Sequence, residues 1–483
     1  MNFIYIQEHL IDPVNKTLYT YVLVYLLVAV GIYFTIRTRF VQFRYFRRML
    51  GQLFHSRVSD GGISSFQAFC VGLASRVGTG NIAGVAIALT VGGPGAIFWM
   101  WMVALIGMAT ALIEATLAQI FKVRAGDGTF RGGPAYYIQR GLGSRAGGVV
   151  FAVLLVFTFG FAFNMVQANA IADVLNTTHE IEQHYTTIGL MLLAGPVLFG
   201  GVRRVAKVAE IVLPLMALAY VLLAVVIIAL NISHLPGVFG QIIGGAFGVT
   251  QMAGGFTGGI AAAMLNGVKR GLFSNEAGMG SAPNVAATAT VSHPVKQGLI
   301  QSLGVFVDTM IVCTATAFII LVSGPEIYDP SKPTRMAGAS LTQAAVSANL
   351  GSWTTWLMTI LVFVFAFSSV LGNYVYAEVN LFFLGAKGRV ITIFRVLVLC
   401  AIGIGALARL DAVWGIADIS MGLMAIVNLI AIVLLGKWAF AALRNYHSQA
   451  EAGEDPEFIA DEAGLPGHLD GDIWIRSRSP LMK

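Results

Sequence analysis

Residues 72–84 read GLASRVGTGNIAG, a glycine-rich polar stretch in the middle of the apolar run 64–91. A second stretch, AGGFTGG at 253–259, interrupts the apolar run 236–266. Each glycine disfavours a helix by about 1 kcal/mol relative to alanine, so both stretches predict points where a membrane helix unwinds. Unwound backbone at membrane depth needs surrounding protein or a water-filled cavity, and it offers carbonyls to cations and amides to anions. Close helix packing through small residues is the simpler alternative.

The composition places these runs in a membrane protein. Apolar residues make up 57% of the chain and charged residues only 11%, whereas soluble domains have roughly 25% charged residues. So few charges cannot cover a water-facing surface. The three cysteines show no paired spacing and no histidine lies inside an apolar run, so neither a metal centre nor a histidine proton relay is expected. The sequence therefore predicts an all-α polytopic membrane protein.

A membrane span needs roughly 20 mostly apolar residues, and the sequence predicts eleven such spans. Their approximate ranges are 18–36, 64–91, 94–121, 146–175, 186–200, 204–230, 236–266, 297–322, 353–383, 390–408 and 412–436. Lys and Arg gather in loops on one side of this arrangement, starting with 37–57, and the loop 176–185 has none. Basic loops stay cytoplasmic, so the N-terminus is expected outside. The tail 437–483 is expected to be a cytoplasmic, acidic and partly disordered extension.

The two interrupted runs are the second and the seventh of the eleven, so they cross the membrane in opposite directions. This order is typical of an inverted five-plus-five repeat with one additional helix in front. The chain then divides into an N-terminal helix and basic loop at 1–63, a transporter core at 64–436, and the tail. Within the core, the repeats cover about 64–230 and 236–436.

Three motifs resemble those of the alanine or glycine:cation symporters. GGPGAIFWMWM at 92–102 resembles the signature segment of that family, FSNEAGMGSAPN at 273–284 its cytoplasmic motif, and FRGGPAYY at 130–137 a third motif. The resemblance extends from about residue 40 to 436. It implies a LeuT-type fold that imports small neutral amino acids, chiefly alanine and glycine, with Na⁺ across the inner membrane of a prokaryote. It implies Na⁺ as the co-transported ion with no organic cofactor and no nucleic-acid partner. The chain is expected in the lipid bilayer, and its oligomeric state stays open, a monomer included.

The same resemblance places the substrate between the two interrupted runs. Backbone amides near Gly78, Thr79 and Gly80 would hold the substrate carboxylate. Carbonyls near Gly254 and Gly255 would hold its ammonium group.

Three side chains are implied at this pocket. Gln167 is similar to a family residue that binds substrate from the facing helix, although an intramembrane Gln is more often an interhelical hydrogen bond. Phe256 would cap the pocket or simply pack. Asn373 stands where the family often has Trp, which leaves the pocket size and the choice of substrate open.

The ninth run offers Ser368 and Ser369 as paired hydroxyls. With the carbonyls of Ala74 and Val77 they would form an oxygen cage like LeuT-type sodium sites, since hard cations prefer oxygen ligands. Asn81 is a further oxygen candidate. The alternative is that the serine hydroxyls bond back to their own helix.

Several charged residues lie at or within the predicted spans. A charge in lipid is costly, so each should face a cavity or a partner. Asp308, in mid-span, is the candidate for ion coupling, while Glu114 and Glu378 are expected to brace helices. Glu210 is a further acid of this kind. Arg76, beside the first break, is expected to pair with an acid and act as a gate element.

The sequence therefore predicts a secondary active transporter that works by alternating access, and not an enzyme. Proton coupling in place of sodium stays open. A channel is less favoured, because its filter would repeat while the two interrupted runs differ. An enzyme would need a clustered nucleophile and base or metal ligands. Alanine against glycine, D against L, stoichiometry and oligomeric state are not settled by the sequence.

Overall fold

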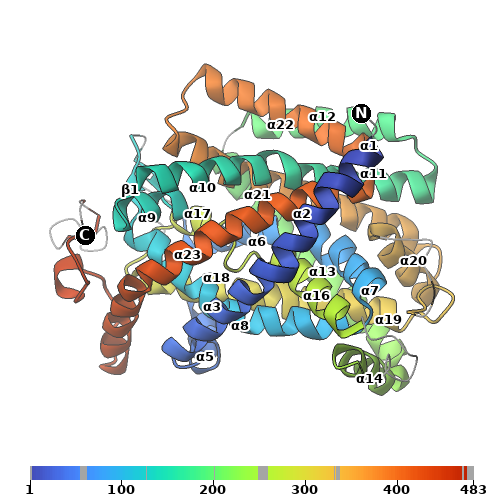
Figure 1. The fold of residues 1–483 in the computed structure, drawn as a ribbon, viewed down its shortest axis with the longest axis horizontal. Helices are drawn as coiled ribbons and strands as arrows, with labels where there is room; N and C mark the ends of the chain where they lie inside the picture. The colour runs from blue at the N-terminus through green and yellow to red at the C-terminus, as the bar shows by residue number, and fades with distance from the viewer. Residues whose placement is uncertain are drawn as a thin grey trace.

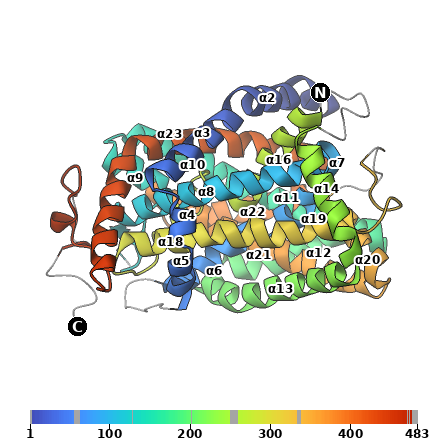
Figure 2. The same ribbon diagram turned by 90° about the horizontal axis from the view of Figure 1, so that it is seen from below.

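The protein is a bundle of long helices that run side by side along one axis, as the computed structural model shows in two perpendicular views (Figure 1 and Figure 2). The structure describes residues 3–54, 63–126, 128–200, 202–248, 259–330, 332, 338–469, 471 and 473–475. A small hairpin of two short antiparallel strands, β1 and β2, is the sheet found in this part of the chain.

In chain order the elements are α1 (Phe3–Ile6), η1 (Gln7–Ile11), α2 (Asp12–Thr17), η2 (Leu18–Leu23), α3 (Val24–Arg37), α4 (Val41–Arg44), α5 (Phe46–Phe54), α6 (Ser65–Arg76), η3 (Gly80–Gly84), α7 (Val85–Gly92), α8 (Gly95–Ile120), β1 (Val123–Arg124), β2 (Phe130–Arg131), α9 (Pro134–Gly141), α10 (Arg145–Phe157), η4 (Thr158–Ala162), α11 (Phe163–His179), α12 (Gln183–Leu198), α13 (Val202–Leu230), η5 (Ile232–His234), α14 (Leu235–Ala246), α16 (Gly259–Asn275), α17 (Pro283–Ala286), α18 (Pro294–Val305), η6 (Phe306–Cys313), α19 (Thr314–Leu321), α20 (Ala339–Leu350), α21 (Thr354–Phe383), α22 (Arg389–Leu407), α23 (Leu410–Glu451) and η7 (Ala460–Glu462).

Seven helices in the described ranges are long and apolar enough to cross a membrane, or up to nine if two bent helix pairs count as one span each. The seven are Gln7–Arg37, Gly95–Ile120, Arg145–His179, Pro294–Leu321, Thr354–Phe383, Arg389–Leu407 and Leu410–Glu451. The prediction of an α-helical multi-pass membrane protein is confirmed. This count does not confirm eleven spans, since α12 and α16, with 16 and 17 residues in the described ranges, are shorter than the roughly 20 residues of a typical span.

The predicted seventh run, 236–266, is divided differently from the expectation. Its first residues belong to α14, which ends at Ala246 and forms a 77° bent pair with α13. The backbone of α14 meets the start of α8, where a β-carbon on Gly95 would lie 2.3 Å from the carbonyl carbon of Gly245. Glycine here permits a close helix contact. α14 begins at Leu235, within one residue of the expected start at 236, whereas α16 continues to Asn275, past the expected end at 266. Residues 249–258 lie outside the described ranges.

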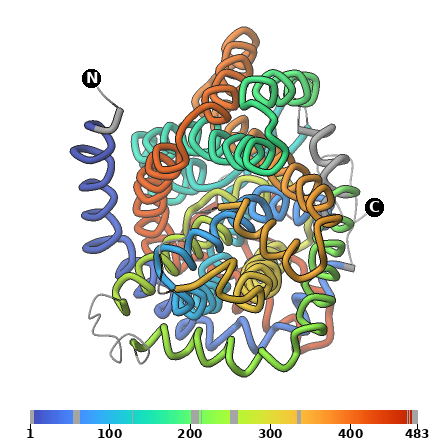
Figure 3. The backbone as a smooth tube through the Cα atoms, turned by 90° about the vertical axis from the view of Figure 1, so that its right-hand side faces the viewer, coloured from blue at the N-terminus to red at the C-terminus, as the bar shows by residue number. Residues whose placement is uncertain are grey.

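The two views agree on what lies at each end of the bundle. Helix α9 and the C-terminal tail are at one end, and α14, α20 and the N-terminus are at the other (Figure 1 and Figure 2). An odd number of crossings would produce this separation of the chain ends. Seen end-on, the N-terminal helices lie on the outer edge of the bundle, as a helix added to a core would (Figure 3).

The acidic tail packs against one end of the bundle. The backbone N–H of Phe458 donates to the carbonyl of Ser292 (2.9 Å), and Trp474 Nε1 donates to the carbonyl of Gln119 (3.1 Å). The ammonium of Lys122 lies 4.9 Å from the centre of the Trp474 ring. Phe458 and Trp474 are both buried. They therefore anchor a segment that the acidic composition had predicted to be partly disordered.

Candidate substrate and cation site

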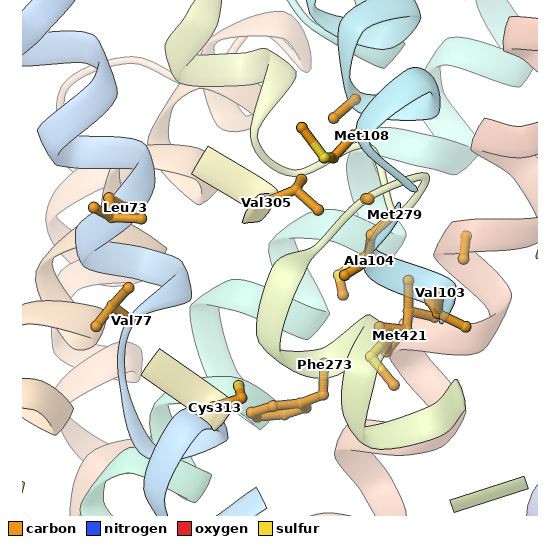
Figure 4. Packing of buried hydrophobic residues seen from close by; sticks show 14 of the residues in the cluster. Leu73, Val77, Val103, Ala104, Met108, Phe273, Met279, Val305, Cys313 and Met421 are labelled. Carbon is orange, nitrogen blue, oxygen red and sulfur yellow. The ribbon is translucent and has the colours of Figure 1, made fainter. Parts of the chain in front are cut away.

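The first interrupted run breaks where the sequence predicts. Helix α6 ends at Arg76, and Val77 leaves the helix with φ −77° and ψ 85°. Thr79 is the N-cap of η3, and the two halves are bent by 47°. The break is therefore confined to residues 77–79. Figure 4 shows Leu73 on α6 and Val77 at the start of the break.

Two glycines let other helices approach this break closely. A β-carbon on Gly78 would lie 2.0 Å from Ser369 Oγ, and one on Gly80 would lie 3.0 Å from the Phe273 ring. A side chain at Gly78 would therefore displace Ser369 of α21, and one at Gly80 would press on α16. Both positions need glycine because of close approach, in addition to the freedom that glycine gives an unwound backbone.

Side-chain oxygens hold the backbone amides of the break. The N–H of Gly78 donates to Asn81 Oδ1 (2.9 Å), and the N–H of Thr79 donates to Gln167 Oε1 (3.2 Å). Gln167 lies on α11 and is only 2% exposed, so the facing helix reaches the break. Thr79 Oγ1 is buried and has no hydrogen-bond partner among the described residues. The break thus presents two amide donors, both paired with neutral oxygen acceptors.

Asn373 contacts a different part of α6. Its Nδ2 donates to Asn164 Oδ1 (3.0 Å). Ser75 Oγ, which has one proton to donate, lies 2.8 Å from Asn373 Oδ1 and 3.0 Å from Glu276 Oε1. A buried network therefore joins α6, α11, α21 and the loop after α16. The hydrogen bonds of Asn373 connect it to this network and not to the amides of Gly78 and Thr79.

Ser369 meets the last turn of α6. Its hydroxyl lies 3.0 Å from the carbonyl oxygen of Ala74 and 3.1 Å from that of Phe365. Ser368 donates to the Phe365 carbonyl of its own helix (2.9 Å), the alternative that the sequence left open. Val77 is buried beside them at the break. We call the Ala74 carbonyl and the Ser369 hydroxyl the neutral cluster.

Asp308 forms a second oxygen cluster at the break. Its Oδ1 accepts from Asn81 Nδ2 (2.7 Å), and its Oδ2 accepts from Ser274 Oγ (2.7 Å) and Thr309 Oγ1 (2.8 Å). All four side chains are fully buried. Ser274 lies near the end of α16, so the carboxylate joins the first break to the helix that follows the second glycine-rich stretch. We call Asp308, Asn81, Ser274 and Thr309 the carboxylate cluster.

Asn81 belongs to this second cluster in the structure, although the sequence analysis grouped it with Ser368 and Ser369. Its Oδ1 holds the Gly78 amide while its Nδ2 holds Asp308. One side chain therefore connects the Gly78 amide with the buried carboxylate. Its neighbour Cys313 lies close to Phe273 in the same region (Figure 4).

Sequence reasoning missed Ser274, Thr309 and Glu276. Ser274 and Glu276 belong to the FSNEAGMGSAPN motif, which marked the segment without indicating what its side chains contact. Thr309 directly follows Asp308, so a hydroxyl next to an intramembrane acid is the signal that could have identified it.

The other buried acids have structural partners. Glu114 accepts from the backbone N–H of Gly278 (3.3 Å) and from Asn428 Nδ2 (2.9 Å). Glu378 forms an ion pair with Arg395 at 3.2 Å. Both contacts join different parts of the chain, as the bracing role predicts.

Arg76 does not form the expected pair with an acid. Its Nη1 donates to the backbone carbonyl of Gln301 (3.3 Å), and its Nε and Nη2 have no hydrogen-bond partner within the described ranges. The predicted residues Gly254, Gly255 and Phe256 lie outside those ranges.

The chain matches the model of the sodium:alanine symporter family over residues 4–460. It is 49% identical over 473 residues, 97% of this chain and 96% of the relative, to the "Probable sodium/glutamine symporter GlnT" of Bacillus subtilis. It is 47% identical over 452 residues, 94% of each chain, to the "Amino-acid carrier protein AlsT" of the same organism.

The fold is also similar to a solved structure. A manganese transporter from Eremococcus coleocola superposes with a TM-score of 0.51 over 79% of this chain and 80% of that chain. The sequences are only 14% identical, so this similarity concerns the fold alone.

Proposed function

The chain belongs to the sodium:alanine symporter family, and on that premise we propose that it imports small neutral amino acids together with Na⁺ by alternating access. Its family is one of membrane transporters and not of enzymes. The observation that carries the proposal is the break at residues 77–79, where two backbone amides donate to side-chain oxygens that a substrate carboxylate can replace.

The substrate carboxylate takes the places of Asn81 Oδ1 and Gln167 Oε1 at the amides of Gly78 and Thr79. Hydrogen bonds to a charged acceptor are roughly twice as strong as neutral ones, so this exchange favours binding. Gln167 then turns its Nε2 donor toward the carboxylate. Gly80 lies beside the same amides, and because it has no side chain the Phe273 ring can lie close to it.

The substrate ammonium group is proposed to meet the carbonyls of Gly254 and Gly255. Phe256 is proposed to close the pocket over the side chain of the substrate. Asn373 completes the pocket from α21 when the network around Ser75 rearranges.

The neutral cluster is proposed to hold Na⁺. The Ser369 hydroxyl turns its lone pairs toward the ion, and Ser368 and the Val77 carbonyl supply further oxygens. Neutral oxygen ligands suit a hard cation that must also be released. Asp308 is proposed to couple a cation to transport through Asn81, which contacts both the Gly78 amide and this carboxylate.

We further propose the architecture that this mechanism needs. It consists of eleven spans in a LeuT-type five-plus-five inverted repeat with one helix added in front, the N-terminus outside and the C-terminus in the cytoplasm. Residues 1–63, 64–436 and 437–483 are the added helix with its basic loop, the core and the tail. The separation of the chain ends (Figure 2) and the break within the first core helix support this arrangement.

Alanine and glycine are proposed as the substrates. The Phe273 ring lies 4.5 Å from the Phe163 ring and 4.5 Å from the Trp414 ring, centre to centre, and it borders Gly80. This aromatic group leaves little room beside the break. Because one relative is named a glutamine symporter, glutamine is the informative competitor.

A proton in place of Na⁺ is the second candidate. The observation that favours it is the fully buried Asp308, since a carboxyl in such a place is able to carry a proton through the cycle. A membrane channel has no comparable support.

Uptake of labelled alanine into proteoliposomes tests the proposal. An inward Na⁺ gradient should drive accumulation above equilibrium, and an inward proton gradient in potassium buffer should not. Unlabelled glycine should compete more strongly than glutamine. Accumulation driven equally by protons without Na⁺ would replace this proposal with the proton-coupled one.

A further inference from the structure

One face of α18 and the first residues of its continuation η6 carry three polar side chains with a glycine between them. Gln297, Gln301, Gly304 and Asp308 follow one another at positions i, i+4, i+7 and i+11, which lie on the same side of a helix. The helix begins at Pro294, beside the docked tail. The polar face therefore extends from that end of the bundle to the carboxylate cluster.

The two glutamines on this face are buried without partners. Gln297 is 0% exposed and Gln301 is 1% exposed, and the amide oxygen and nitrogen of each have no hydrogen-bond partner among the described residues. Burying an unpaired amide is costly. Asp308 on the same face differs, because it accepts from three donors. The two unpaired amides therefore lower the stability of this arrangement of the helices.

Arg76 lies against the middle of this face. A β-carbon on Gly304 would be 2.5 Å from Arg76 Nη1, and one on Gly72 would be 3.3 Å from Gln301 Oε1. Gly304 is thus the position that leaves room for the guanidinium. Arg76 is 2% exposed, and two of its donors are unpaired.

Buried carboxylates surround this guanidinium at longer range. Arg76 interacts electrostatically with Glu114, Glu276 and Asp308. Glu276 is engaged elsewhere, since its Oε1 lies 3.0 Å from Ser75 Oγ and its Oε2 accepts from Ser281 Oγ at 2.6 Å. A counter-ion for Arg76 is therefore near, but is bound to hydroxyls in this arrangement.

We propose that the polar face of α18 is a water-filled route between Asp308 and the cytoplasm in another state of the cycle, and that Arg76 is its gate. The inference rests on the proposed sodium symport. Water entering the route satisfies Gln297 and Gln301. A cation on its way out must pass Arg76, so the route opens to cations when the guanidinium leaves this face and pairs with Glu276.

Cysteine labelling tests the route directly. Gln301→Cys and, as the matched control, Leu303→Cys are placed in a protein carrying Cys70→Ala, Cys313→Ala and Cys400→Ala. Leu303 is on the same helix and equally buried, at 1% exposure, but two residues away and thus on another face. Inverted membrane vesicles expose the cytoplasmic side to membrane-impermeant methanethiosulfonates, one bearing a sulfonate and one bearing a trimethylammonium group.

The expected result without Na⁺ is labelling of Gln301→Cys that is much faster than labelling of Leu303→Cys. Na⁺ is expected to favour the arrangement of this structure, in which Gln301 is buried, and to make the open state a minor one. Because a minor state is typically at most about 10% populated, labelling should then slow by about tenfold. While Arg76 still lies on this face and has not paired with Glu276, the sulfonate reagent should react faster than the ammonium reagent. Arg76→Gln should remove that preference for the anionic reagent, and Arg76→Lys should restore it.

Equal labelling of Gln301→Cys and Leu303→Cys in the absence of Na⁺ would overturn the route. A reagent preference that survives Arg76→Gln in a variant with normal melting would overturn the gate. These results are independent of uptake. Sodium-driven uptake without labelling contradicts this inference alone, whereas labelling without sodium-driven uptake contradicts the proposed function.

Discussion

The neutral cluster and the carboxylate cluster contact the same break but differ in charge. The neutral cluster pairs the carbonyl of Ala74 with the hydroxyl of Ser369, at 3.0 Å. The carboxylate cluster surrounds Asp308 with three donors at 2.7 to 2.8 Å. The first can lose a cation and leave no net charge behind. The second leaves a buried negative charge unless a cation, a proton or strong hydrogen bonds compensate it.

In the proposed mechanism, this difference gives the two clusters different tasks. A neutral cage releases its ion readily and is suited to sensing the Na⁺ concentration on either side. A buried carboxylate makes the empty carrier costly to return and thereby couples the ion to the substrate. Asn81 connects this carboxylate to the Gly78 amide, so a substrate carboxylate bound at that amide would change the surroundings of Asp308 directly.

The largest effect is expected for Gly80→Val, which acts on the break that both clusters share. A β-carbon there would lie 3.0 Å from the Phe273 ring and 3.3 Å from Cα of Ser274. Valine should abolish alanine uptake while the protein still melts within about 5 °C of the parent. Gly189→Val is the matched control, because a β-carbon on Gly189 meets open space. Alanine-induced thermal stabilisation of Gly80→Val equal to that of the parent would remove the substrate from this break.

Asp308→Asn should give the next largest effect, because it removes the charge of one cluster only. Each hydrogen bond to a charged group contributes about 1.5–3 kcal/mol, so the free energy of cation binding should weaken by about 2–3 kcal/mol. The measurement is the Na⁺ concentration that gives half-maximal uptake. Complete loss of uptake would also fit the expectation. Glu378→Gln, at the Arg395 ion pair, is the control and should lower stability without changing the Na⁺ dependence. An unchanged Na⁺ dependence in Asp308→Asn would break the comparison.

Ser369→Ala should have a smaller effect on the same measurement. A neutral ligand is worth about 1 kcal/mol, so half-maximal uptake should need about five times more Na⁺ and recover at saturation. Ser368→Ala sharpens the test, because the Ser368 hydroxyl bonds to Phe365 of its own helix. An equal shift in both variants would show that the ion recruits both hydroxyls. No shift in either would remove the neutral cluster from sodium binding.

Gln167→Ala should have the smallest effect, since it removes one hydrogen bond to the substrate. Alanine affinity should fall by about 0.5–1.5 kcal/mol, measured by calorimetry at saturating Na⁺. Asn169→Ala on the same helix is the control, because Asn169 donates to backbone carbonyls of Gly405 and Ala408. It should lower the melting temperature and leave alanine affinity intact. The reverse pattern would identify Gln167 as a packing residue.

The sequence predicted those features of the site that depend on the residue types within one short segment. The break at Gly78 and Gly80 follows from the helix propensity of glycine, and the buried Asp308 is a charge in an apolar run. The facing Gln167 came from the family resemblance. These residues are brought together in the structure at the predicted positions.

The partners of these residues could not be predicted, because they depend on packing between distant segments. Ser274 and Asn81 reach Asp308 from other helices, and only the fold decides that Asn81 contacts Asp308 instead of Ser369. Pairwise contacts of this kind leave no periodic signal in one sequence.

The end of the seventh run was predicted at residue 266, whereas α16 continues to Asn275, and the docking of the tail on the bundle was not predicted. Glycines that mark a close contact, such as Gly245, have the same local signature as glycines that unwind a helix. In the tail, Phe458 and Trp474 are buried against the bundle. These two contacts hold a segment whose acidic composition alone predicts partial disorder.

Calorimetric titration of alanine at a series of Na⁺ concentrations, with choline as the replacement ion, tests the central claim most directly. If Na⁺ and alanine both bind at this break, their two sites are coupled. Each ligand then changes the affinity for the other by the same factor. The account predicts that alanine affinity rises with Na⁺, that Na⁺ affinity rises equally with alanine, and that Asp308→Asn reduces this coupling. Alanine affinity that is identical in Na⁺ and in choline would contradict it.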